Sequence, residues 1–384
     1  WSNLGTTLRR LERIDDALEC FRNAVRLQPR LAEVHTNLGT CLLAAGDMEG
    51  AVESYKVAFR LKRAPTLGKP EAERRAQWLA DTSDPRFLWT TTAKLRHDIE
   101  QFRHLMEIGR LPEQFGGVAG DYEEVLQELQ SLPGEKAVIT LTSAQREKIA
   151  STYNKAVFIA EAPALAQDPV NPNLDAEALQ KDYFANAPGI TYFDDFLTPE
   201  AIESLRRFCQ ESVFWFDTNR NGYLGAYLSD GFYCDLLFQI AESLRQRLPR
   251  IFGERRLRQM WAYKYDSRLS GIERHADAAA VNANFWITPD EANLDPESGG
   301  LTVYTRETPM EWDFEKYNRD QVALEEILEG SDSLTIPYRQ NRIALFNSNL
   351  VHKTDVIRFR EGYEYRRINV TMLFGHRGDA PRVS

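Results

Sequence analysis

Two histidines and one aspartate in the second half of the chain have the residue types and spacing to hold a metal ion. His275 and Asp277 stand two positions apart. On a strand, their side chains would therefore lie on the same face and offer an imidazole nitrogen and a carboxylate oxygen to one ion. His352 would supply a third ligand. Three such ligands on one face of an octahedron leave three positions open, an arrangement associated with non-haem Fe(II).

Segments typical of β-strands surround these residues. A His-x-Asp pair alone is weak evidence, because chance supplies one in many chains of this size. The surrounding segments are rich in aromatic and β-branched residues and are separated by turn-forming residues. They comprise residues 259–265 before the pair and residues 281–288, 297–304, 341–352 and 366–374 after it. This succession is compatible with a jelly roll of two sheets.

The order of these motifs resembles that of the Fe(II)- and 2-oxoglutarate-dependent dioxygenases, especially the prolyl-hydroxylase-like branch. The resemblance covers roughly the last half of the chain, from Tyr192 onward. It rests on the His275-x-Asp277 pair, Ser298-Gly299-Gly300-Leu301 at a strand start, the segment from Ala344 to His352, and Arg367 in the last strand. It implies Fe(II) bound by His275, Asp277 and His352, with 2-oxoglutarate and O2 as co-substrates. It also implies hydroxylation coupled to decarboxylation of 2-oxoglutarate to succinate.

The far carboxylate of 2-oxoglutarate would need a cation, best an arginine whose planar guanidinium binds it through two hydrogen bonds. Arg366 and Arg367 both stand within fifteen residues of His352. The apolar residues of this strand share a face with Arg366, and its polar residues share a face with Arg367, which suits the interior of a barrel. We therefore expect Arg367 to bind the carboxylate, with Arg366 as the alternative.

Two further residues are expected in the co-substrate pocket. Tyr265 stands ten residues before His275, where members of the family often carry a tyrosine that hydrogen-bonds the co-substrate; a core aromatic is the alternative. Asn282 and Asn284 alternate with apolar residues on the next expected strand and would be costly to bury unpaired. We expect Asn284 or Trp286 to line the pocket. The family often has a tyrosine at this place, and this chain does not.

The beginning of the chain repeats itself with a period of 34 residues. Leu4-Gly5 recurs as Leu38-Gly39, and Phe21 recurs as Tyr55. This period, with small residues where two helices touch, resembles the tetratricopeptide repeat. Such arrays usually need at least three units. We therefore expect either further repeats upstream of Trp1 or a cap formed by the helices that follow.

The fold class predicted for the chain is multidomain α and β. Residues 1–64 are expected to form a tetratricopeptide-like helical solenoid, residues 65–185 a helical connector or cap, and residues 186–384 a double-stranded β-helix (jelly roll) with bracing helices. Apolar residues at helical spacing predict helices at residues 91–108, 121–132, 143–160, 198–209 and 230–246.

The composition argues against several classes of protein. A net charge of -10 over 384 residues argues against a nucleic-acid partner, which needs a basic surface. No apolar run is long enough to span a bilayer and no signal-peptide pattern is present, so no membrane partner is expected. The four cysteines have neither paired spacing nor the density of a secreted scaffold. We expect them to be reduced and mostly buried in a cytoplasmic protein.

Three functions fit these features. The first is an enzyme that hydroxylates a side chain in a protein or peptide partner bound by the repeats, because stacked helix pairs present a concave surface suited to extended partners. The second is a small-molecule or amino-acid hydroxylase of the same superfamily, with the repeats serving oligomerisation. The third is a non-catalytic tetratricopeptide scaffold. The intact set of His275, Asp277, His352 and Arg367 favours an enzyme.

Overall fold

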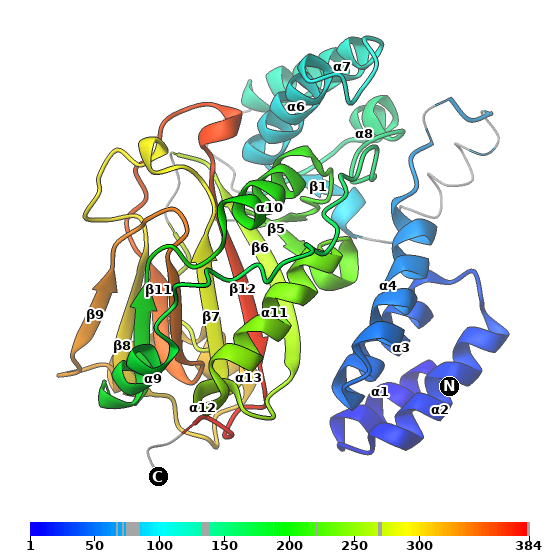
Figure 1. Ribbon diagram of the computed structural model, residues 1–384. Helices are drawn as coiled ribbons and strands as arrows, with labels where there is room; N and C mark the ends of the chain where they lie inside the picture. The colour runs from blue at the N-terminus through cyan, green and yellow to red at the C-terminus, as the bar shows by residue number, and fades with distance from the viewer. Residues whose placement is uncertain are drawn as a thin grey trace. The chain divides into compact units, whose positions relative to one another are not determined.

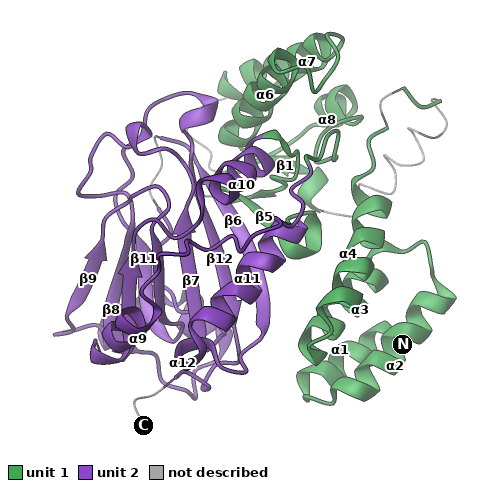
Figure 2. Ribbon diagram, in the orientation of Figure 1, with its two compact units in different colours: residues 1–160, 211–220, 224–233 green, residues 161–210, 221–223, 234–384 purple. Residues whose placement is uncertain are grey.

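The computed structural model describes residues 1–66, 68–70, 73, 85–131, 138–186, 188–219, 222–267 and 271–381. The chain divides into two compact units (Figure 2). The first comprises residues 1–160, 211–220 and 224–233, and the second comprises residues 161–210, 221–223 and 234–384. The expected division at residue 64 into repeats and connector stays a prediction.

Two helix pairs begin the first unit: α1 (Ser2–Arg10), α2 (Ile14–Leu27), α3 (Ala32–Ala45) and α4 (Met48–Arg63). The repeated glycines allow each pair to pack closely. A Cβ atom on Gly5 would lie 2.9 Å from the Phe21 ring, and one on Gly39 would lie 2.7 Å from the Tyr55 ring. The 34-residue period in the sequence therefore corresponds to the same glycine–aromatic contact made twice.

The remainder of the first unit consists of η1 (Pro85–Phe87), β1 (Trp89–Thr90), α6 (Thr92–Glu107), α7 (Phe115–Gln130), β2 (Ile139–Thr140), α8 (Ser143–Ile149), β4 (Asp217–Thr218), β5 (Leu224–Tyr227) and η2 (Leu228–Asp230). Two of the predicted helices are present as α6 and α7, and residue 132 lies outside the described residues. The helix predicted at 143–160 is wrong in length. It ends at Ile149, and the residues that follow are not helical: Asn154 has a φ of 54° and the Ala156 N–H donates to the Arg63 carbonyl at 2.7 Å.

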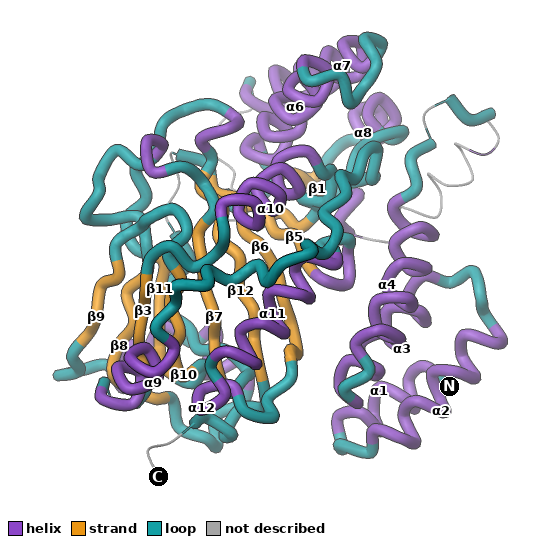
Figure 3. Tube along the Cα trace, in the orientation of Figure 1, coloured by secondary structure: helices purple, strands orange, loops and turns teal. Residues whose placement is uncertain are grey.

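Two antiparallel sheets build the second unit (Figures 1 and 3). The larger one contains, in spatial order, β3 (Ile190–Phe193), β10 (Ile343–Asn347), β7 (Val281–Trp286), β12 (Arg367–Phe374) and β6 (Leu257–Tyr265). The smaller one contains β11 (Leu350–Thr354), β8 (Leu301–Glu307) and β9 (Ser333–Ile336). From β7 to β12 the chain crosses repeatedly between the sheets, with β8 and β9 paired in the smaller one, and side chains from both sheets form one buried cluster. This arrangement confirms the predicted jelly roll.

Helices cover the outer face of the larger sheet. The second unit contains α9 (Ala176–Ala185), α10 (Pro199–Glu211), α11 (Asp235–Arg247), α12 (Pro249–Phe252), η3 (Asp290–Ala292), α13 (Phe314–Arg319), α14 (Gln321–Ile327) and η4 (Tyr363–Tyr365). On the helix side of the sheet, the ring of Phe374 lies 4.7 Å from that of Phe252, and the ring of Phe285 lies 5.3 Å from that of Phe196. The helix predicted at 230–246 begins only at Asp235, because Gly231 has a φ of 105°. The apolar face of β12 thus packs on the helix side of the sheet, as the sequence predicted.

No helix within the described ranges is long and apolar enough to cross a membrane. Cys20, Cys41 and Cys209 are buried, as expected, and Cys234 is partly buried.

Candidate metal centre

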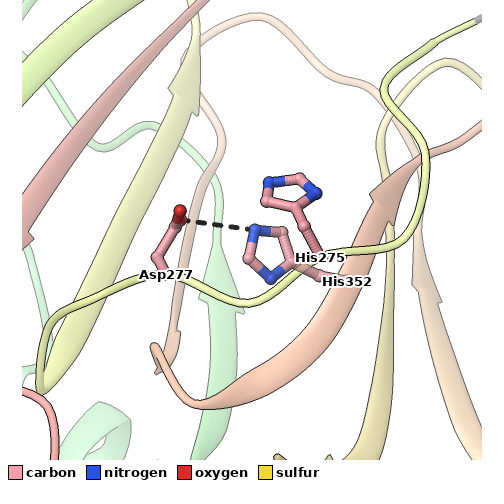
Figure 4. A group of neighbouring side chains, drawn as sticks. All are labelled: His275, Asp277 and His352. Atoms are coloured by element: carbon pink, nitrogen blue, oxygen red, sulfur yellow. Dashed lines mark ion pairs between the residues drawn. The ribbon is translucent and has the colours of Figure 1, made fainter. Parts of the chain in front are cut away.

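His275, Asp277 and His352 come together at one point of the second unit. Figure 4 shows their side chains facing one another, two from a loop and one from a neighbouring strand. One donor atom from each residue lies within 4.8 Å of the other two. The His275 and His352 ring centroids are 4.3 Å apart, and Asp277 Oδ2 lies 3.5 Å from His352 Nε2. The three residues therefore have the proximity that a shared metal ion requires.

His275 and Asp277 lie in the loop between β6 and β7, so their predicted placement on a regular strand is wrong. His275 instead forms a local antiparallel bridge with His352 on β11, with N–H···O distances of 3.0 and 2.8 Å. The Asp277 N–H donates to the Ser348 carbonyl at 3.0 Å. These few backbone bonds hold the loop against β11 and align the donor atoms without a continuous strand.

Hydrogen bonds to backbone carbonyls fix the tautomer of both histidines. His275 Nδ1 lies 2.8 Å from the Glu273 carbonyl, and His352 Nδ1 lies 3.0 Å from the Leu350 carbonyl. A carbonyl only accepts, so each ring donates from Nδ1 and keeps the Nε2 lone pair for a metal. Burial and the neighbouring His352 lower the pKa of His275 to about 4. The His275 ring is therefore neutral at neutral pH, the form that binds metals.

Asp277 is a buried carboxylate that stays ionised. Burial alone would raise its pKa, but its interactions with His352, His275 and Asn282 lower the pKa below its usual value. Asn282 Nδ2 donates to Asp277 Oδ2 at 2.8 Å. The site thus offers one carboxylate and two imidazoles, the set associated with non-haem Fe(II).

The segment between β8 and β9 holds the backbone between the two loop ligands. The Ala276 N–H donates to the Tyr317 carbonyl at 2.9 Å, and Asn318 Nδ2 donates to the Ala276 carbonyl at 3.0 Å. Gln321 Nε2 donates to the Arg274 carbonyl at 2.8 Å. The sequence did not predict that this segment positions the ligand loop, because hydrogen bonds between residues so far apart in the chain produce no recognisable sequence pattern.

Arg367 is a buried cation on the interior face of β12. It is 1% exposed; its Nε donates to the Gly299 carbonyl at 2.6 Å, Nη2 to the Gly300 carbonyl at 3.3 Å and Nη1 to Asn369 Oδ1 at 3.3 Å. No carboxylate among the described residues forms an ion pair with it. Burial lowers the pKa of Arg367, as expected for a cation removed from water. A buried charge without a counter-charge is unfavourable, so an anion at this place would be stabilised.

The Gly299-Gly300 motif has a steric reason. Gly299 has a φ of 84°, and a Cβ atom on Gly300 would lie 1.8 Å from the Ile336 carbonyl oxygen. Only glycine fits at position 300, because any side chain would push β8 away from β9. This close packing brings the two glycine carbonyls to the guanidinium of Arg367, a link that the sequence did not reveal.

Arg366, the alternative cation, has a different environment. It is 6% exposed, and its Nη1 lies 3.8 Å from Asp266 Oδ2. Arg366 therefore has a carboxylate at 3.8 Å, whereas Arg367 forms no ion pair with a described residue.

Three aromatic side chains surround the guanidinium of Arg367. Its Cζ lies 4.8 Å from the Tyr265 ring centroid, 5.8 Å from that of Trp286 and 5.9 Å from that of Tyr338. Tyr265 is the register partner of Arg367, and its hydroxyl lies 3.4 Å from Thr354 Oγ1. Thr354 follows His352 by two residues on β11, so the two side chains share a face about 7 Å apart along the strand. Tyr265 thus contacts both Arg367 and the strand that carries His352.

Asn284 and Trp286 also lie on the interior face of β7 and are both buried. Asn284 Nδ2 donates to Thr371 Oγ1 at 2.9 Å, so the amide already has a partner within the protein. Trp286 Nε1 has no hydrogen-bond partner among the described residues. Of the two residues expected to line the pocket, Trp286 is the one with an unused donor.

Residues 2–65 match the family model of the tetratricopeptide repeat, which confirms the repeat predicted from the 34-residue period. A search of curated proteins found no match.

Several solved structures are similar to a little more than half of this chain. They include the non-heme alpha-ketoglutarate-dependent carbocyclase SnoK from nogalamycin biosynthesis, at 13% identity over 57% of this chain and 92% of that one, with a TM-score of 0.42. A prolyl-4-hydroxylase from Pseudomonas putida is 16% identical over 53% of this chain and all of its own, with a TM-score of 0.33. HygX from Streptomyces hygroscopicus, with nickel, 2-oxoglutarate and hygromycin B bound, is 12% identical over 53% of this chain and 88% of its own, with a TM-score of 0.35. At these TM-scores the activity has to be inferred from the chain's own residues.

Proposed function

We propose that this protein is a non-haem Fe(II)- and 2-oxoglutarate-dependent dioxygenase that hydroxylates a side chain in a protein or peptide. The observation that carries the proposal is the buried Arg367, which lacks an ion-pair partner among the described residues and is linked by Tyr265 and Thr354 to the strand of His352. A metal site alone would suit many proteins. A metal site beside a buried cation suits a ligand that chelates the metal at one end and carries a carboxylate at the other.

The residues of the site fit both Fe(II) and 2-oxoglutarate. His275 and His352 present Nε2 lone pairs, Asp277 presents an ionised carboxylate, and three ligands leave room for a chelating co-substrate and O2. When bound, Fe(II) and 2-oxoglutarate supply the oxidation of an unactivated C–H bond by O2, with release of succinate and CO2. Arg367 binds the far carboxylate of the co-substrate, and the surrounding rings of Tyr265, Trp286 and Tyr338 exclude water from it.

A protein or peptide substrate is supported by the repeats at residues 2–65. Arrays of helix pairs present a concave surface that binds extended chains. We propose that the repeats recruit the polypeptide that the second unit hydroxylates.

One observation favours a small-molecule substrate instead. A hollow of about 480 Å³ is lined by Arg274, the neighbour of His275, by Tyr304, and by five residues of the segment 322–329. This volume lies within the roughly 300–1,000 Å³ typical of small-molecule sites.

Succinate release tests the function and the class of substrate together. The full chain, with Fe(II), 2-oxoglutarate and O2, is incubated with a peptide library or with amino acids and other small molecules, and succinate is measured. We expect succinate formation to rise with particular peptides, and to be lost in Asp277→Ala. Stimulation only by small molecules would move the assignment to the second function, and no succinate under any condition would contradict both.

A further inference from the structure

Asn282 is a fully buried amide that contacts a proposed metal ligand directly. It lies on the interior face of β7, is 0% exposed, and its Nδ2 donates to Asp277 Oδ2 at 2.8 Å. An ionised carboxylate only accepts hydrogen bonds, so this contact fixes which end of the amide faces Asp277. The amide oxygen must then face elsewhere.

The amide oxygen of Asn282 is left without a donor among the described residues. A second buried atom near Asp277 is in the same state: Ser348 Oγ has no partner in the described part of the chain, and the Ser348 carbonyl accepts the Asp277 N–H at 3.0 Å. Buried polar atoms are nearly always hydrogen-bonded, and each exception needs an explanation. Both exceptions here belong to residues that contact Asp277.

Asn284 provides the contrast. It has the same side chain on the same face of the same strand, two residues further on. Its Nδ2 donates to Thr371 Oγ1 at 2.9 Å, and its Oδ1 accepts from Asn369 Nδ2 at 3.5 Å. Both ends of the Asn284 amide therefore have a partner, whereas the oxygen of the Asn282 amide has none among the described residues.

We propose that Asn282 is a positioning residue of the metal centre: its N–H fixes the orientation of the Asp277 carboxylate, and its free oxygen accepts a hydrogen bond from a donor that enters with the metal. This inference rests on the proposed metal centre and adds to it a residue that contacts no metal. A carboxylate held in this way does not have to be ordered when the metal binds, and partners of this kind typically raise metal affinity by 10- to 100-fold.

The test compares two substitutions of equal size, Asn282→Leu and Asn284→Leu, in the full chain. Mn(II) is the probe, because it needs no turnover and its free form is counted by electron paramagnetic resonance. The dissociation constant for Mn(II) is measured without 2-oxoglutarate, alongside the melting temperature of the metal-free protein. We expect Asn282→Leu to weaken Mn(II) binding about 10- to 100-fold and Asn284→Leu to leave it unchanged. Asn282→Ser, which keeps a short donor, should fall between wild type and Asn282→Leu, and replaces the latter if that variant does not fold.

The outcomes separate the roles of the two asparagines. A lower melting temperature of Asn282→Leu with wild-type Mn(II) affinity would make Asn282 a packing residue and overturn the inference, while the metal centre would stand. Equal loss of Mn(II) binding in both variants would also overturn the inference. The loss would then result from making this face of β7 less polar, and not from removing the contact with Asp277. Failure of the wild type to bind Mn(II) or Fe(II) would remove the metal centre itself, and the role of Asn282 with it.

Discussion

Replacing Arg367 by methionine should strongly weaken 2-oxoglutarate binding while leaving the ligand-free fold largely intact. The substitution removes a buried cation that is 1% exposed and has no ion pair among the described residues. It also removes three hydrogen bonds, to Gly299, Gly300 and Asn369. Loss of the uncompensated charge raises the free energy of unfolding of the ligand-free protein, and loss of these bonds lowers it. The net change in this free energy should therefore be small.

The effect of this substitution on 2-oxoglutarate binding should be large. Hydrogen bonds to charged groups contribute about 1.5–3 kcal/mol each, so two bonds from a guanidinium to a carboxylate contribute about 3–6 kcal/mol. At 1.4 kcal/mol per factor of ten, the dissociation constant should rise about 10²- to 10⁴-fold.

Thermal unfolding with Mn(II) present measures this change. At a 2-oxoglutarate concentration of about 100 Kd, the wild type gains about 2.7 kcal/mol of stability, whereas Arg367→Met should gain about 0.4 kcal/mol or less. Arg366→Met is the matched control and should keep the wild-type gain. The reasoning is refuted if Arg367→Met is stabilised like the wild type. If Arg366→Met loses the gain instead, the co-substrate is bound by the neighbouring arginine.

Three other changes probe separate parts of the structure. Asn318→Ala should weaken Mn(II) binding about 10-fold, since partners of metal ligands have effects of this order; unchanged affinity would show that the 3.0 Å bond to the ligand loop does not position it. Gly300→Ala should lower the free energy of unfolding by several kcal/mol in chemical denaturation, because its Cβ would overlap the Ile336 carbonyl, and wild-type stability would show that β8 shifts freely. Asp230→Asn should destabilise the first unit by about 3–5 kcal/mol at neutral pH, because it leaves the buried Arg63 without its carboxylate partner at 2.8 Å. Burial would raise the pKa of Asp230, but Arg63 lowers it below its usual value, so this stabilisation is present above about pH 4 and is lost as the pH falls through the folded-state pKa. A gap between Asp230→Asn and wild type that stays constant from neutral to acid pH would contradict this account.

The alternation of side chains along strands gave the most accurate sequence-based predictions. On β12 it placed Arg367 in the interior and the apolar residues against the helices, and both placements hold because side chains on a strand alternate strictly. The 34-residue period was equally reliable, since it reflects one glycine–aromatic contact made twice.

Alternation could not give the details of the metal centre. His275 and Asp277 were assigned to a strand, but the backbone between them bonds to Tyr317 and lies in a loop. Asn282 and Asn284 have the same parity, so the pattern did not show which of them reaches Asp277. These contacts depend on how distant loops meet, and no local pattern records that.

Chelation of 2-oxoglutarate to bound Fe(II) is the central claim, and visible absorption under anaerobic conditions tests it most directly. An α-keto acid chelated to Fe(II) produces a metal-to-ligand charge-transfer band that neither component gives alone. We predict this band for the full chain only when Fe(II) and 2-oxoglutarate are both present, and its absence in Asp277→Ala. A wild-type chain that shows no band at saturating concentrations of both would contradict the account.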